Sequence, residues 1–143
     1  MAAFNSFNQT IADIANGVHN LGSDTIKIAF TNTAPNSATN SVFADLTEIA
    51  AGNGYTAGGP TLTIGSSSQT GGTYTLVGGN SPTLTATGGS IATFRYIVIY
   101  NDTAASKNLI SWYDYGSAVT VNEDETFVVN ANGVTLISGT LSA

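Results

Sequence analysis

The chain of 143 residues contains no cysteine and has few positive charges. Without cysteine it forms neither a disulfide nor a thiolate metal site. Its three basic residues, Lys27, Arg95 and Lys107, stand against nine acidic ones and leave a formal net charge of −6. Three scattered cations are too few to neutralise a phosphate backbone or to hold an anionic bilayer. We therefore expect neither nucleic acid nor membrane as a partner.

Charged residues of both signs make up only 8% of the chain, far below the usual share of about 25%. Serine, threonine, asparagine and glycine must therefore cover much of the surface. Copies of a protein with such a surface repel each other little, which suits a protein that becomes part of an assembly. Because no apolar run could span a bilayer and residues 1–4 have no basic region, we expect no membrane segment and no secretory signal. The length indicates one domain over residues 1–143.

Two neighbouring segments predict the centre of a β-sheet core. Residues 91–100 are apolar and β-branched with few breaks, as in a strand that is covered on both faces. Residues 109–115 alternate more weakly and follow a polar loop at 101–108. We expect the two segments to pair in the antiparallel direction.

Apolar residues near the N-terminus recur at spacings of three and four: Phe4, Phe7, Ile11, Ile14 and Val18. This period predicts an α-helix over about residues 6–16 whose apolar stripe is buried and whose polar face, with Asp13, is exposed. Asn5 or Ser6 is expected to cap its start, and Gly17 or Gly22 to end it. The helix either docks on its own sheet or forms an arm that packs on a neighbouring subunit.

Further short segments have strand patterns, with glycine-rich turns between them: 23–31, 61–64, 74–77, 83–87, 118–121, 126–130 and 134–138. The first of these predicts one buried face, with Lys27 and Ala29 on the other. Residues 66–72 predict a turn, and Asn132-Gly133 predicts a tight hairpin between the last two strands. One short helix and eight or nine strands predict a mainly β fold. We expect a β-sandwich over about residues 23–138, and a jelly roll is the specific kind of sandwich that we consider.

A glycine-dense segment covers residues 52–59, GNGYTAGG. A phosphate-binding loop would need a helix directly behind it, because the helix N-terminus aims backbone N–H groups at the anion. Here Pro60 and a strand pattern follow instead. We therefore expect a structural turn with positive φ angles.

The chain offers few groups for catalysis. His19 is the only candidate base for a serine triad, and its place at the end of the predicted helix indicates an exposed residue or one that bonds the last helix carbonyls. The acidic run 123–125 indicates a solvated turn, with a weak hard-cation site as the alternative. Asp102 and Asp114 flank the central loop and could form a glycosidase pair, although Asp102 is more simply a turn residue. We expect no catalytic residue, metal or cofactor, and therefore no enzyme.

Arg95 lies inside the most apolar strand of the chain. A charge at such a position must be paired, exposed on an edge or placed at a subunit contact. We expect a pair with Asp114 or Asp102 within the fold, and an ion pair between subunits is the alternative.

Three aromatic residues, Trp112, Tyr113 and Tyr115, lie close together in the second central segment. Flat aromatic rings are what sugar faces pack on, so these residues could form a glycan-binding platform. Strand alternation, however, places Trp112 on the opposite face from the two tyrosines. Packing in the core is the simpler interpretation.

Four stretches together resemble a family of small virion structural proteins of tailed bacteriophages. They are VHNLGSDTIKIAFTNTAPN at 18–36, DLTEIAAGNGYTAGG at 45–59, FRYIVIYNDT at 94–103 and WYDYG at 112–116. The resemblance covers about residues 4–136.

The resemblance implies a capsid decoration or cement protein that binds the outer head surface, bridges capsomers and stabilises the shell. Such proteins commonly form β-sandwich or jelly-roll homotrimers. The implied partners are the major capsid protein of the same virion and further copies of this chain, and the protein would be made in the host cytoplasm. Chain ends and long loops reach outward, so we expect assembly contacts in segment 1–7, in loop 31–41 and at the charge inside the strand. The residues are Phe4, Phe7, Pro35, Asn36 and Arg95.

Two other functions remain open from the sequence. The chain could be a tail-fibre or adhesin module that binds host surface glycans through Trp112 or the tyrosines. It could also be a hydrolase that uses Asp102 and Asp114. Binding to empty expanded heads separates the structural role from the glycan-binding one.

Overall fold

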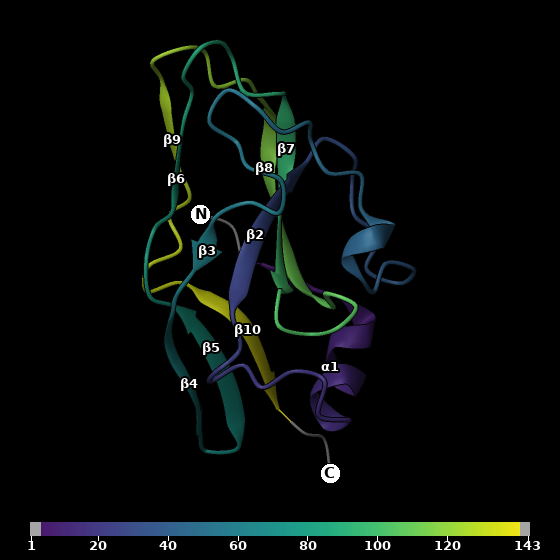
Figure 1. The fold of residues 1–143 in the computed structure, drawn as a ribbon. Helices are drawn as coiled ribbons and strands as arrows, with labels where there is room; N and C mark the ends of the chain where they lie inside the picture. Colours follow the sequence, from purple (N-terminus) through teal and green to yellow (C-terminus); the bar gives the residue numbers. More distant parts are fainter. Residues whose placement is uncertain (1–3, 141–143) are drawn as a thin grey trace.

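A computed structural model of the chain describes residues 4–140. The fold is mainly β, with one short N-terminal helix (Figure 1). In chain order the elements are β1 (Asn5–Ser6), α1 (Asn8–Ala15), β2 (Ile26–Thr31), the 3₁₀ helix η1 (Phe43–Asp45), β3 (Thr61–Leu62), β4 (Ile64–Thr70), β5 (Thr73–Gly78), β6 (Thr83–Thr85), β7 (Phe94–Asn101), β8 (Leu109–Val119), β9 (Thr126–Val128) and β10 (Thr135–Thr140).

The strands form antiparallel sheets that pack together. One sheet has the order β1-β8-β7-β2-β3, a second has the order β10-β5-β4, and β6 pairs with β9 in a third. In Figure 1 the β6–β9 pair lies beside the large sheet, and the β10-β5-β4 sheet lies below it. The predicted fold class is confirmed. A jelly roll calls for eight strands in two sheets, whereas these strands divide five, three and two.

The predicted central hairpin is confirmed. β7 pairs with β8 in the antiparallel direction, with Val98 opposite Trp112 and Ile97 opposite Tyr113. β7 begins at Phe94 rather than at residue 91, because the buried Ile91 instead bonds through its N–H to the carbonyl of Val121. β8 continues to Val119, so the separate strand expected at 118–121 is wrong.

Both faces of the large sheet are covered. Phe30, Phe94 and Ile97 pack on one face in the main core, whereas Ala29 and Val98 pack on the other with Tyr100 and Phe7. The one-sided pattern expected for residues 23–31 is wrong at Ala29, which has no exposed surface. A continuous apolar run is the pattern of a strand buried on both sides.

Helix α1 buries a different face from the one predicted. Thr10 and Asp13 are buried, whereas Ile11 is 63% exposed. Thr10 faces the sheet because its hydroxyl donates to the carbonyl of Ile110 at 2.9 Å. The expected caps are also wrong, since residues 5–6 form β1 and no side chain caps the helix. Gly17, with φ +76°, follows the helix end as expected.

Strand β4 was not predicted, because its sequence is polar and glycine-flanked. Every residue from 65 to 70 is exposed, so the strand carries no alternating apolar signal. The expected turn at 66–72 is therefore wrong except at Gly71 and Gly72. The hairpin at Asn132-Gly133 is also wrong, since β9 pairs with β6 and β10 pairs with β5. The Gly133 N–H instead donates to the carbonyl of Gly78.

The glycine-dense segment 52–59 forms the predicted turn. All four of its glycines have positive φ angles, and so does Asn53. Glu48 holds the turn from one side: its carboxylate accepts from the Tyr55 hydroxyl and from the Gly58 N–H, both at 2.6 Å. The segment is thus a fixed connection that leads directly into β3.

Candidate functional site

Arg95 forms the ion pair that was expected within the fold. Its Nε lies 2.9 Å from Asp114 Oδ1 and its Nη2 lies 3.1 Å from Oδ2. The guanidinium also lies over the ring of Tyr96, 5.4 Å from the centroid. The Arg95 hydrogen bonds hold the pKa of Asp114 below its usual value. This fork geometry holds the two side chains against each other across the neighbouring strands β7 and β8.

Asp102 and Asp114 lie at opposite ends of β7. Asp114 belongs to β8 opposite Tyr96, whereas Asp102 follows the last residue of β7. Asp102 contacts two lysines, Lys107 by a hydrogen bond and Lys27 at 3.7 Å, and the hydrogen bond from Lys107 is the main reason for its lowered pKa. The two carboxylates therefore do not form the glycosidase pair that the sequence left open.

The other residues expected at assembly contacts differ in accessibility. Phe7 is 2% exposed and Pro35 is buried, so both pack inside this chain. Phe4 is half-buried against Tyr113, with ring centroids 5.5 Å apart. Asn36 is exposed. Of this set, Asn36 and Arg95, whose side chain is 40% exposed, offer the most accessible surface.

The aromatic residues of β8 lie on two faces, as alternation predicted. Trp112 is half-buried and packs with Val98 and Leu109, while its indole N–H donates to Ser37 Oγ at 2.9 Å. Tyr113 is buried on the opposite, core face. Tyr115 is 45% exposed. Among these three residues, the accessible aromatic ring is therefore that of Tyr115.

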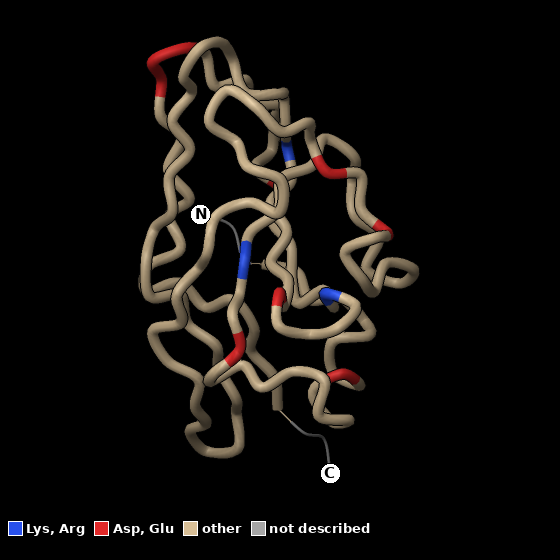
Figure 2. The backbone as a smooth tube through the Cα atoms, in the orientation of Figure 1, with Lys and Arg blue, Asp and Glu red and all other residues tan. Residues whose placement is uncertain are grey.

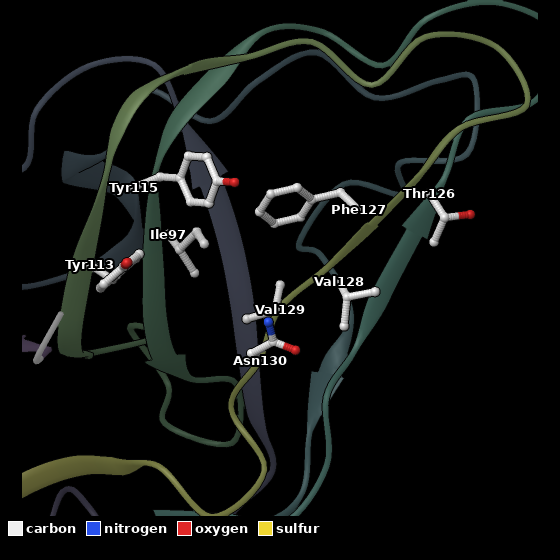
Figure 3. A pocket seen from close by; sticks show the side chains of 8 residues that line it. All are labelled: Ile97, Tyr113, Tyr115, Thr126, Phe127, Val128, Val129 and Asn130. Carbon is white, nitrogen blue, oxygen red and sulfur yellow. The ribbon is translucent and has the colours of Figure 1, made fainter. Parts of the chain in front are cut away.

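Tyr115 borders a shallow space between β8 and β9 that we call the aromatic hollow (Figure 3). Its ring meets Phe127 edge-on, with centroids 5.4 Å apart, and Phe127 rests on Phe94 at 5.1 Å. The hollow has a volume of about 290 Å³ and is lined by uncharged residues only: Ile97, Tyr113, Tyr115, Thr126, Phe127, Val128, Val129 and Asn130. Sequence reasoning missed the contribution of β9, because only the sheet topology brings it beside β8.

A second space, which we call the helix groove, lies between α1 and the β10-β5-β4 sheet. It consists of two hollows of about 350 and 390 Å³ that share four lining residues. Apolar side chains and glycine dominate the shared part: Ile11, Ile14, Ile137 and Gly139. Tyr74 and Thr140 line its far end. No charged residue lines either hollow.

His19 is buried in a polar network rather than exposed as predicted. The Asn101 amide donates to His19 Nδ1 at 3.1 Å and to Asp24 Oδ2 at 2.6 Å. Asp13 lies on the other side, 3.9 Å from His19 Nε2, and accepts from Asn108 at 2.9 Å. Because the imidazole has no exposed surface, it ties the helix to the sheet and is not placed to meet a substrate.

We predict that acid weakens the fold through His19. Burial lowers its pKa below 6.5, although Asp13 and Asp24 partly oppose this shift. Below pH 6.5 the unfolded chain therefore binds a proton at His19 more readily than the folded chain does. The free energy of unfolding has its full value above pH 6.5 and falls as the pH drops below it. Urea unfolding at pH 7, 6 and 5 measures this slope. His19→Gln should flatten it, and an equal slope in the variant would contradict the assignment.

The acidic run 123–125 forms the solvated turn that was expected. Its residues are exposed, and the Glu125 carboxylate accepts from the backbone N–H of Asn122 at 2.9 Å. Among residues 4–140, no group of three or more His, Asp or Glu side chains could hold a metal ion. Within the same residues, no helix is long and apolar enough to cross a membrane.

Comparison of the chain with protein-family models, curated protein sequences and solved structures found no match.

Proposed function

We propose that this chain is a bacteriophage virion structural protein that decorates the capsid. It binds the major capsid protein on the outer head surface, bridges capsomers and stabilises the shell without catalysing a reaction. Three properties support the proposal: the family resemblance of four sequence stretches, a surface with few charges, and antiparallel sheets that hold two uncharged hollows in fixed positions.

A cement protein acts by burying area against its neighbours. A specific contact needs at least about 1,000 Å² of total buried surface, and repetition over a shell multiplies weak contacts into large avidity. Uncharged, partly apolar surfaces suit this task, since burying them does not remove water from a charged group, which would cost free energy. Sheets that pack on a common core also lose little conformational freedom on binding.

The resemblance of the four sequence stretches is the observation that carries the proposal, and we assign the contact with the major capsid protein to the aromatic hollow. Tyr115 presents a large ring that is 45% exposed, and Phe127 fixes that ring from behind. Tyrosine is enriched among the residues that dominate binding energy at protein interfaces. An apolar segment of a capsid subunit would pack on Tyr115 and on the neighbouring Val128, which is 44% exposed.

We predict that Tyr115→Ala weakens binding to empty expanded heads by about 30-fold, as expected for a loss of about 2 kcal/mol at a central contact. Binding is measured by cosedimentation of purified protein with heads that lack it. Val18→Ala removes another partly exposed apolar side chain, distant from the hollow in sequence, and should bind as the wild type does. Equal affinity of Tyr115→Ala and wild type would contradict the assignment.

Glycan binding is the second candidate function. The aromatic hollow is a better place for a sugar than the platform around Trp112 that the sequence left open. The exposed ring of Tyr115 and the exposed Asn130 would offer a sugar a stacking face and an amide. In that case the protein would be retained on host surface polysaccharide and not on heads. Tyr115→Ala would then abolish retention while the far-ultraviolet circular dichroism stayed unchanged.

A further inference from the structure

The helix groove leaves a large apolar side chain in solvent. Ile11 is 63% exposed, the largest exposed fraction among the large apolar residues of the described chain. It stands at the rim of a space that is lined by Ile14, Tyr74 and Ile137. An exposed apolar projection beside an apolar concave surface indicates an interaction site rather than a free surface.

The face around the groove carries no exposed charge. β4, β5 and β10 contain no charged residue, and the single one in α1, Asp13, is buried. Figure 2 shows the β4–β5 hairpin and β10 without charged positions. Apart from the buried Asp13, the charged residues of the chain therefore lie elsewhere on the molecule.

An unprotected strand edge lies on the same sheet. β4 is the last strand in the order β10-β5-β4 and contains neither a charge nor a proline. Natural proteins usually protect such edges with lysine, proline or a covering element, because the unpaired backbone groups pair with other chains. The described β4 edge has only the register irregularity between Ile64 and Ser66, and its regular part from 66 to 70 is explained if another molecule covers it in the assembled state.

We propose that this face is the contact between copies of this chain, with Ile11 of one copy seated in the helix groove of the next. Two chains of net charge −6 repel each other electrostatically. The repulsion is smallest where their uncharged faces meet. The projection and the groove lie on one face, so the surface can complement a second copy of itself. This inference deepens the proposed function, since self-association would link decoration proteins to one another on the head.

Sedimentation velocity of the purified wild type over a dilution series should show a concentration-dependent oligomer. Ile11→Asp places a charge in the contact and should raise the dissociation constant at least about tenfold. Val128→Asp, on β9, is the matched control and should assemble as the wild type does. A wild type that stays monomeric throughout, or an Ile11→Asp variant that assembles as tightly, would overturn the proposal.

Disulfide cross-linking tests the same contact by geometry, because the native chain contains no cysteine. A mixture of Ile11→Cys and Thr140→Cys chains, one of them carrying a size tag, should give a mixed covalent dimer under mild oxidation. Val128→Cys mixed with Thr140→Cys should not. Absence of the first product overturns the proposal even where Ile11→Asp fails to fold. Both experiments use protein without capsids, so their failure is distinct from a failure to bind heads.

Discussion

Gly59→Ala is expected to destabilise the protein more than any other glycine substitution in segment 52–59. A Cβ at Gly59 would lie 1.6 Å from the carbonyl oxygen of Ile28 and 2.8 Å from its carbon, and the φ angle is +74°. The neighbouring backbone is fixed, because the Ile28 N–H donates to the carbonyl of Pro60 at 3.0 Å. We expect a loss of more than about 4 kcal/mol in the free energy of unfolding, measured by urea denaturation.

Gly71→Ala separates this steric clash from backbone strain. Gly71 also has a positive φ angle, +59°, but a Cβ there would meet nothing within 4 Å. Only the left-handed backbone should then cost energy, about 1–2 kcal/mol. If both variants lost the same amount, the close approach of Gly59 to β2 would be disproved.

Phe94→Ala should cost about 3–5 kcal/mol, as is typical when a buried phenylalanine is truncated. Phe94 has no exposed surface and packs edge-on against Phe30 at 4.8 Å and against Phe127 at 5.1 Å. The substitution would leave a cavity where the large sheet meets β9. Urea unfolding again gives the measurement.

Tyr115→Ala is the matched control for this core substitution. Tyr115 also contacts Phe127, but its ring is 45% exposed, so its loss should cost less than about 1.5 kcal/mol. Phe94→Leu should recover much of the stability, since it leaves a smaller cavity. A cost below 1.5 kcal/mol for Phe94→Ala would contradict the position of this ring at the centre of the core.

The sequence predicted those parts of the fold that depend on local pattern. The pairing of β7 and β8 follows from two adjacent segments and a short loop, and the turn at 52–59 follows from glycine itself. Predictions from local pattern were wrong where contacts between distant parts of the chain decide which residues are buried. Ile11 has helical spacing but faces solvent, because Thr10 bonds to β8 and Asp13 bonds to Asn108 just before that strand. The polar β4 carried no signal at all.

The candidate sites were harder to predict for the same reason. The Arg95–Asp114 pair was foreseen, since both residues lie in neighbouring strands of one hairpin. The aromatic hollow was not, because Tyr115 meets Phe127 only once β9 has joined β6 beside the large sheet. The Asn132-Gly133 pattern pointed to a different partner for β9. A turn signal of two residues does not outweigh the burial gained by the observed pairing.

The position of β2 in the large sheet governs how this chain folds. β2 pairs with β7, and the partners lie 65 to 75 residues apart in the chain. A long segment must therefore be closed into a loop before the β2–β7 pairing gains any free energy, which places folding in the range of milliseconds to seconds. During that interval the uncharged strands β4 and β5 can pair with strands of other chains and aggregate. The yield of refolding should therefore improve when the protein is diluted.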